Sequence, residues 1–127
     1  MVQQGVALLA LHRYEDALTS FDISLSIQPK CYYAWNSRGL VLAKLERHEE
    51  AIASFDRSIR AKSDNPQAWY GKARSCAALG DLSSTVNNLY RAMILSPNLY
   101  KVMAKTDSEF DTMRHDQRFQ ALMNTSG

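Results

Sequence analysis

Cysteine is scarce in this sequence, with only Cys31 and Cys76 among 127 residues. Two cysteines are too few for a disulfide framework, and they lack the CxxC spacing of many metal and redox sites. Structural disulfides are rare in compartments that keep thiols reduced. We therefore expect free thiols and a cytoplasmic protein.

The net charge is small, and long apolar runs are missing. The 15 Lys and Arg exceed the 13 Asp and Glu by two, and both signs are interspersed along the chain. Without a basic arm or an acidic tail, no nucleic-acid partner is expected. No stretch approaches the roughly 18 apolar residues of a membrane-spanning helix. The opening VALLALH also lacks the basic region and cleavage site of a signal peptide, so no membrane partner is expected.

Catalytic motifs are missing as well: the chain contains no GxxxxGK[ST], GxGxxG or GxSxG. Three histidines, which we expect to be exposed to solvent, are not spaced as metal ligands: His12, His48 and His115. The carboxylate pair Glu49-Glu50 stands at an expected helix start, where negative charge offsets the helix dipole. We therefore expect no enzyme, no cofactor and no metal site.

What the sequence does contain is a period of 34 residues. Residues of the same type recur at this offset as Trp35 and Trp69, Gly5 and Gly39, Ala17 and Ala51, Phe21 and Phe55, Asp22 and Asp56, Ser24 and Ser58, and Leu11, Leu45 and Leu79. Several coincident matches at one period of this length indicate stacked units of two helices.

The pattern resembles the tetratricopeptide repeat (TPR), which has Trp, then Leu-Gly, then Tyr, with a later Ala, Phe and Pro. The matching residues are Trp35, Gly39, Ala51 and Phe55 in a central unit, Gly5, Ala17, Phe21 and Pro29 in a first unit, and Trp69 and Pro97 in a third. Cys76 falls at the Tyr place, where we expect it to fill the core as a small apolar residue. The resemblance implies an all-α fold, a right-handed α-solenoid of helix–turn–helix repeats.

The resemblance also implies a division of the chain. Residues 1–97 would form three TPR units, at 1–31, 32–65 and 66–97, and residues 98–127 would form C-terminal capping helices and a tail. The expected helices lie at about 1–11, 14–27, 32–45, 48–61, 66–79 and 82–95, with a further helix at about 98–105. Gly80 would supply a left-handed residue between two helices, and Asp81 would cap the second of them.

A shorter period follows the third unit. Three residues that read as a helix cap and two apolar positions, Asp107, Phe110 and Met113, recur nine residues later as Asp116, Phe119 and Leu122. We expect two short helices in this closing segment (residues 107–123), which resembles the end of many bacterial TPR arrays. Such a segment is expected because the apolar face of the last repeat must be covered. Residues 124–127 are expected to fray.

In TPR arrays the first helix of each unit lines a concave groove. By this resemblance, the partner-binding residues would be Tyr33, Asn36, Ser37, Leu40, Lys44, Gln67, Tyr70, Arg74 and Lys101. Exposed Tyr rings beside amides and basic groups suit a peptide or protein segment of acidic character. The leading hypothesis is therefore an interaction scaffold that binds a partner segment in the groove, with exposed rings at Tyr33 and Tyr70.

Particular residues bear on two other functions. The carboxylate clamp of some TPR proteins, which holds an acidic chaperone tail with Lys, Asn and Arg, maps to Val2, Val6, Ser37, Gln67 and Gly71. None of these positions keeps the required residue type, which disfavours that partner. The alternative to a peptide-binding scaffold is a structural spacer or oligomerisation region of a larger signalling or enzymatic polypeptide. Its basis is the apolar N-terminal edge at Val2, Val6 and Leu9, where self-association would occur.

Overall fold

The computed structural model describes residues 1–124, which are helical throughout and contain no strand. The chain divides into two compact units, Met1–Ser63 and a second that begins at Asp64. They are called unit 1 and unit 2 below, and each is described by itself. The last three residues of the expected tail, 125–127, lie outside the described residues.

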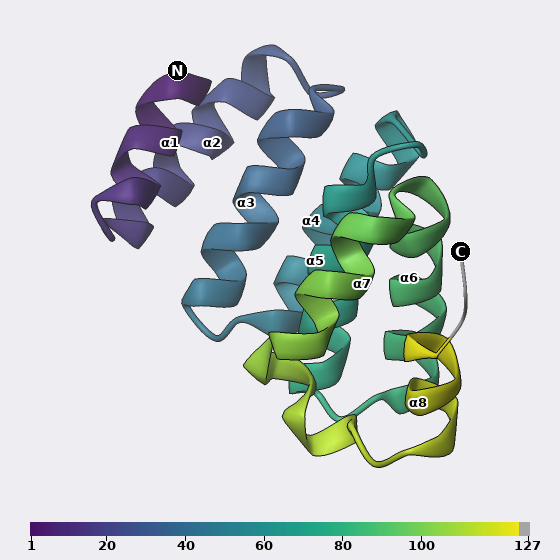
Figure 1. Ribbon diagram of the computed structural model, residues 1–127. Coiled ribbons are helices and arrows are strands. Elements are labelled where there is room, and N and C mark those ends of the chain that lie inside the picture. Colours follow the sequence, from purple (N-terminus) through teal and green to yellow (C-terminus); the bar gives the residue numbers. More distant parts are fainter. Residues whose placement is uncertain (125–127) are drawn as a thin grey trace. The chain divides into compact units, whose positions relative to one another are not determined.

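Unit 1 consists of two helical hairpins. Its helices are α1 (Val2–Ala10), α2 (Tyr14–Ile27), α3 (Tyr32–Lys44) and α4 (His48–Ala61). Within the unit, α1 packs on α2, α2 on α3, and α3 on α4 (Figure 1). Both α2 and α4 have the predicted bounds, and α1 and α3 each end one residue before the predicted end.

Each hairpin of unit 1 is closed by a glycine that contacts a phenylalanine. A Cβ atom added to Gly39 would lie 2.7 Å from Cε1 of Phe55, and one added to Gly5 would lie 2.7 Å from Cε1 of Phe21. Both rings are fully buried. The two helices therefore approach at a distance that only a residue without a side chain allows, as the repeat pattern predicts.

The turns inside the hairpins share a left-handed residue. His12 and Glu46 have φ of 61°, and Gly80 has φ of 78°. These positions are 34 residues apart in the sequence. The left-handed conformation was predicted at Gly80 alone, because non-glycine residues adopt it at a cost of about 1 kcal/mol. Here the repeat imposes it on a histidine and a glutamate.

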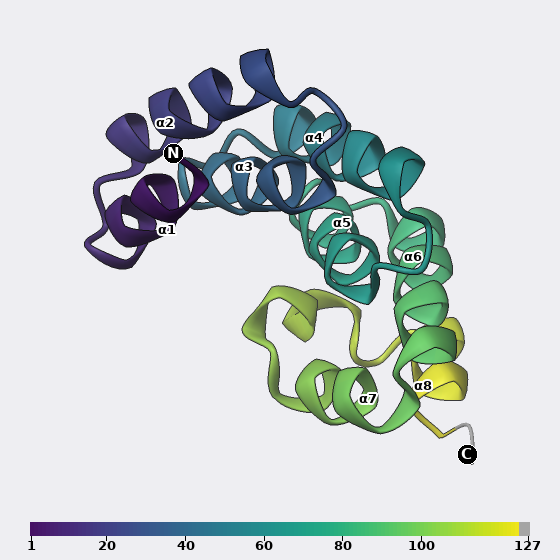
Figure 2. The same cartoon turned by 90° about the horizontal axis from the view of Figure 1, so that it is seen from above.

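Unit 2 contains one hairpin and the segments that cover it. Its elements are α5 (Pro66–Ala78), α6 (Leu82–Leu95), α7 (Pro97–Thr106), the 3-10 helix η1 (Ser108–Met113) and α8 (Gln117–Met123). Contacts join α6 to α7 and α8, and α5 to η1, so the chain folds back over its own last hairpin (Figure 2).

Aspartates begin three of these elements, as predicted. The carboxylates of Asp81, Asp107 and Asp116 accept hydrogen bonds from the backbone N–H groups of the following helical turns. These contacts satisfy donors that a helix start leaves unpaired. The closing segment therefore forms two short helices, although the first is a 3-10 rather than an α-helix.

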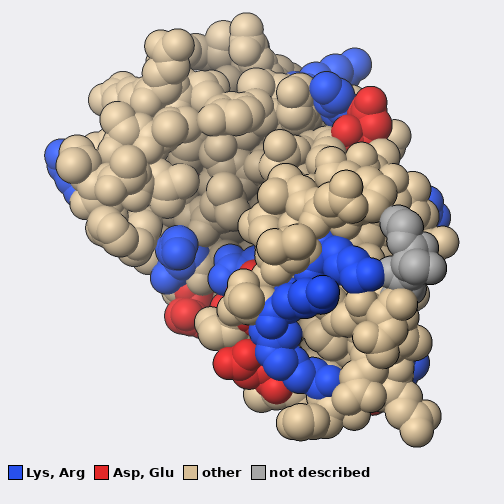
Figure 3. All heavy atoms as spheres, in the orientation of Figure 1, with Lys and Arg blue, Asp and Glu red and all other residues tan. Residues whose placement is uncertain are grey.

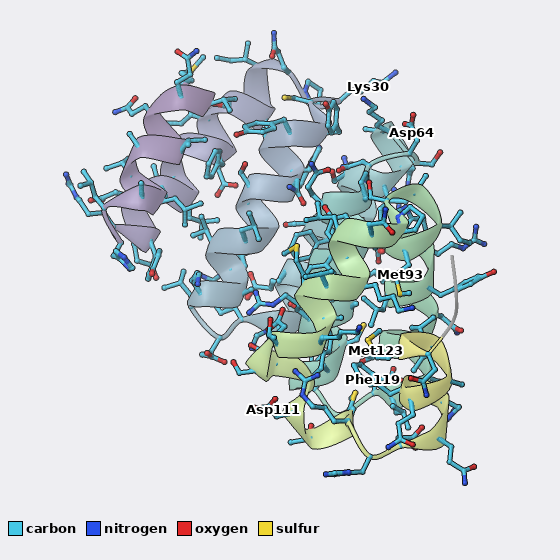
Figure 4. All side chains as sticks on the ribbon, in the orientation of Figure 1. Lys30, Asp64, Met93, Asp111, Phe119 and Met123 are labelled. Atoms are coloured by element: carbon cyan, nitrogen blue, oxygen red, sulfur yellow. The ribbon has the colours of Figure 1, made fainter. Side chains whose placement is uncertain are left out.

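The core of unit 2 contains four neighbouring aromatic rings. Tyr70 lies between Tyr100, with ring centroids 5.0 Å apart, and Phe110, at 5.8 Å. Phe110 in turn lies 5.7 Å from Phe119, which Figure 4 labels beside α8. Met93 of α6 belongs to the same cluster. The cluster thus joins α5, α6 and α7 to the closing segment.

Candidate partner-binding surface

The predicted groove residues of α3 differ in their access to solvent. Tyr33 is 48% exposed, Lys44 is exposed and Leu40 is partly exposed. Asn36 and Ser37 are buried. The first three therefore offer an aromatic ring, an ammonium group and an aliphatic side chain to a partner, while the other two contribute to packing.

Asn36 carries an unused hydrogen-bond acceptor. The residue is 8% exposed, and its Oδ1 has no hydrogen-bond partner among the described residues. A buried polar atom left in this state costs about 1–3 kcal/mol.

Ser24 of α2 is the other buried residue of unit 1 with an unpartnered side-chain oxygen. Its counterpart one repeat later, Ser58, donates to the backbone oxygen of Tyr32 at 2.7 Å. Ser24 forms no such hydrogen bond among the described residues.

The expectation of an exposed ring at Tyr70 is wrong. Tyr70 is 5% exposed, because Tyr100 of α7 and Phe110 of the closing segment cover its ring. Its hydroxyl donates to Oδ2 of Asp107 at 2.6 Å. Burial, followed by this hydrogen bond, raises the pKa of Tyr70 above its ordinary value. The phenol therefore stays protonated and serves as a buried donor.

Arg74 is engaged by the same segment. Its Nε donates to Oδ2 of Asp107 at 2.9 Å, and its Nη2 lies 4.0 Å from a carboxylate oxygen of Glu109. Arg74 and Tyr70 thus share one carboxylate of the chain itself. The acidic ligand expected for these two residues is present within the molecule, as part of its closing segment.

Gln67 and Lys101, the other two predicted site residues of unit 2, lie on different helices. Gln67 is exposed in the first turn of α5, and Lys101 is partly exposed on α7. Lys101 lines a shallow hollow of about 180 Å³ with Tyr90, Met93 and Leu122 among its neighbours. Lys and Arg side chains gather over α7 and the segment that follows it, with acidic side chains beside them (Figure 3). This surface of unit 2 is therefore mixed in charge.

Sequence reasoning missed a pair of contacts between tryptophan and arginine. Cζ of Arg57 lies 4.6 Å from the ring centroid of Trp35, and Cζ of Arg91 lies 5.7 Å from that of Trp69. Such cation–π contacts stabilise by about 0.5–1 kcal/mol at exposed sites. The two arginines are 34 residues apart, so the repeat itself contained the signal.

Histidine 48 also departs from expectation. His48 was expected in solvent, but its side chain is 9% exposed and its Nε2 lies 2.8 Å from Oε2 of Glu46. Glu46 precedes His48 by two residues and has the left-handed backbone of the turn. The contact is local and belongs to the turn.

Among residues 1–124, no group of three or more His, Cys, Asp and Glu side chains is placed to hold a metal ion. Within the same range no helix combines the length and apolar character that crossing a membrane requires.

Comparison with known proteins bears on this surface. A family model described as tetratricopeptide repeat matches residues 2–66, just over half of the chain. No curated protein matches at a significant level. Several solved structures share the fold of an α-solenoid built from helical repeats.

Three of these structures are informative. MamA (residues 41 to its end) from Desulfovibrio magneticus RS-1 is 23% identical with a TM-score of 0.72, and the match covers 96% of this chain and 71% of MamA. The Yersinia enterocolitica type III secretion chaperone SycD, in complex with a peptide of the translocator YopD, is 17% identical with a TM-score of 0.76, covering 95% and 88%. The first TPR of Spaghetti (RPAP3), bound to the HSP90 peptide SRMEEVD, is 16% identical with a TM-score of 0.78, covering 94% and 88%.

Proposed function

Because the chain belongs to the tetratricopeptide repeat family, we propose that it is a protein-interaction module of the cytoplasm that binds an extended segment of a partner along α3. The SycD and RPAP3 structures share its fold and each contain a bound peptide. Both cysteines are free thiols, which suits the proposed compartment. The function is binding and not catalysis.

The observation that carries the proposal is the ring of Tyr33, which is 48% exposed near the start of α3. This ring would cover the partner's apolar atoms with little loss of side-chain entropy. Lys44 favours an acidic residue near the end of α3. The bound segment is therefore proposed to combine an apolar side chain with acidic character.

The chaperone tail recognised by the carboxylate clamp is not the proposed partner. The mapped positions carry Val2, Val6, Ser37, Gln67 and Gly71. None of these side chains can supply the charge that the clamp needs for a terminal carboxylate. The HSP90 peptide of the RPAP3 structure thus illustrates the binding mode and not the partner of this chain.

Photo-crosslinking tests the proposal. A photoreactive residue placed at Tyr33 should capture a partner from the cell of origin, and the partner's labelled segment should be identified by mass spectrometry. The isolated segment should then bind the Tyr33→Ala, Lys44→Ala double variant at least about tenfold more weakly, or 1.4 kcal/mol. Tyr90→Ala is the matched control, because Tyr90 is 51% exposed on α6. Equal binding by all three proteins would overturn the proposal.

A second candidate function rests on the N-terminal edge. Val2, Val6 and Leu9 of α1 are only partly buried within unit 1. A structural spacer or oligomerisation region would cover them with another repeat or a second copy. Light scattering across a concentration series tests this: growth in mass that Val6→Lys abolishes supports self-association, and a constant monomer mass contradicts it.

A further inference from the structure

Unit 1 contains a hollow that shares no residue with the predicted groove. Its volume is about 510 Å³, and it is lined by Pro29, Lys30, Trp35, Arg57, Arg60 and Ala61. The lining comes from the loop between α2 and α3, the first turn of α3, and the last two turns of α4. Figure 4 shows the Lys30 side chain projecting outward from that loop.

The floor of this hollow is held in place by Trp35. The indole Nε1–H donates to the backbone oxygen of Pro29 at 2.7 Å, which fixes the ring against the loop. The guanidinium of Arg57 lies 4.6 Å from the ring centroid. A stacked guanidinium keeps its N–H donors available at the edge of the plane. Arg57 is therefore oriented before any ligand arrives.

The cations of the hollow are unopposed. Lys30, Arg57 and Arg60 form no ion pair among the described residues, and no carboxylate lines the hollow. Three other arginines of unit 1 behave differently: Arg13, Arg38 and Arg47 each pair with a carboxylate at 2.6–2.7 Å. A cation in the last turn of α4 complements the helix dipole, which accounts for Arg60 but not for Arg57 or Lys30.

The hollow continues along the loop. A neighbouring hollow of about 510 Å³ is lined by Gln28, Pro29, Lys30, Cys31 and Tyr32. Nζ of Lys62 lies 4.7 Å from the Tyr32 ring centroid, which adds a fourth cation beside an aromatic ring. The surface therefore alternates positive charge with Trp, Pro and Tyr over more length than one small anion occupies.

We propose that this basic hollow binds an acidic segment of a partner protein, in which Asp or Glu residues flank an aromatic or aliphatic residue. The carboxylates would pair with Arg57, Arg60 and Lys30, where guanidinium forks match carboxylate geometry. The apolar residue would rest on Pro29 and the exposed part of Trp35. The site is independent of the groove on α3, so one chain would offer two separate docking surfaces.

The test uses defined peptides. A labelled peptide acetyl-Asp-Glu-Phe-Glu-Asp-amide is titrated by fluorescence polarisation at low salt into the parent chain and into the Arg57→Ala, Arg60→Ala double variant. We expect binding by the parent that weakens with salt, and at least about tenfold weaker binding by the double variant. Arg13→Ala with Arg47→Ala removes the same charge from paired arginines and should change the affinity by less than about twofold.

Further variants and ligands distinguish the two surfaces and the possible classes of ligand. Tyr33→Ala with Lys44→Ala should leave binding of this peptide unchanged, which distinguishes the hollow from the groove. A Trp69→Phe background makes Trp35 the reporting indole, and its emission should shift on binding. Equal weakening by both arginine pairs would overturn the proposal. So would stronger binding of a phosphoserine peptide, of inorganic phosphate or of a single-stranded oligonucleotide than of the acidic peptide.

Discussion

The hairpins of unit 1 and the hairpin of unit 2 solve one packing problem in two ways. In unit 1 the contact is glycine against phenylalanine, as with Gly39 and Phe55. In unit 2 the positions one repeat later carry Ala73 and Leu89, both fully buried. Neither residue provides aromatic bulk. The third hairpin therefore loses the large side chain that fills the first two.

The aromatic volume of unit 2 comes from elsewhere in the chain. Tyr100, Phe110 and Phe119 are buried against α5 and α6 and are contributed by α7 and the closing segment. A hairpin of unit 1 is filled by its own second helix, whereas that of unit 2 is completed by residues that follow it. Weak matching to a repeat pattern can thus mark a repeat that depends on its flanking segment.

Deleting residues 107–127 should have the largest effect. The truncation removes Phe110, Met113, Phe119 and Leu122 from the core of unit 2 and leaves an apolar face without cover. We expect loss of cooperative melting in unit 2 and aggregation, measured by circular dichroism and light scattering. Hydrogen exchange should still show protected amides in unit 1. A truncated chain that stays monomeric and melts as before would contradict the dependence on the closing segment.

Phe55→Ala should be the most damaging single change. Phe55 is fully buried, and truncation of such a ring costs about 3–5 kcal/mol. Leu89→Ala, its counterpart in unit 2, should cost about 2–5 kcal/mol, with more spread because neighbouring aromatic rings can shift into the space. Denaturant melts measure both values. A loss below about 1 kcal/mol for Phe55→Ala would show that the ring is not part of the core.

Gly39→Ala should destabilise unit 1 by about 1–3 kcal/mol, because overpacking forces side chains or backbone to move. The added Cβ would meet the buried Phe55 ring at 2.7 Å. The reverse change at the equivalent place, Ala73→Gly, should cost about 1–2 kcal/mol, because it adds backbone entropy to the unfolded chain and removes a buried methyl group. Urea melts of both variants compare the sites, and a neutral or stabilising Gly39→Ala would refute the close contact.

Tyr70→Phe should cost about 1–2 kcal/mol, since it removes the buried hydrogen bond to Asp107. The raised pKa of Tyr70 also predicts a pH effect. The unfolded chain releases this proton near the ordinary tyrosine pKa of about 10, while the folded chain retains it. The contribution of Tyr70 to the free energy of unfolding should therefore be fully present below about pH 10 and be lost as the pH rises above that value. Tyr70→Phe should reduce the alkaline slope, and an unchanged slope would exclude Tyr70 as its source.

Asp81→Ala should have the smallest effect, a slight fall in melting temperature. The backbone N–H of Ser84 donates to this carboxylate and lowers the pKa of Asp81. The stabilisation that the ionised Asp81 cap gives to the folded chain is therefore present above the ordinary carboxyl pKa and lost as the pH falls. Asp81→Asn keeps an acceptor at the cap and is the control. The two variants should differ at neutral pH, and equal melting there would argue against the cap.

The helices were predictable because their signals are local. Apolar residues at three- and four-residue spacing, together with the fixed period, placed α2, α4 and α6 at their observed bounds. The left-handed turns at His12 and Glu46 were not predicted, because residue type alone points to glycine at such sites. The conformation there is imposed by the packing of the flanking helices, and the identity of a single residue does not predict it.

The candidate site was predictable only in part. Tyr33 and Lys44 are exposed as expected, since their access depends on the helix that carries them. Tyr70 was misplaced because its burial depends on the closing segment. The nine-residue period indicated that such a segment exists. It did not indicate that Asp107 would contact the hydroxyl of Tyr70. Contacts between distant segments are set by tertiary packing, and the sequence pattern does not contain them.

The hydrogen bond between Tyr70 and Asp107 also bears on the order of folding. It joins residues 37 positions apart, whereas Arg38 and Ser54 in unit 1 are 16 apart. Closing the longer loop costs about 0.7 kcal/mol more in chain entropy, and distant contacts form more slowly than local ones. During synthesis, α5 and α6 emerge before the segment that completes them. The apolar face of this hairpin is therefore uncovered until the closing segment has also left the ribosome.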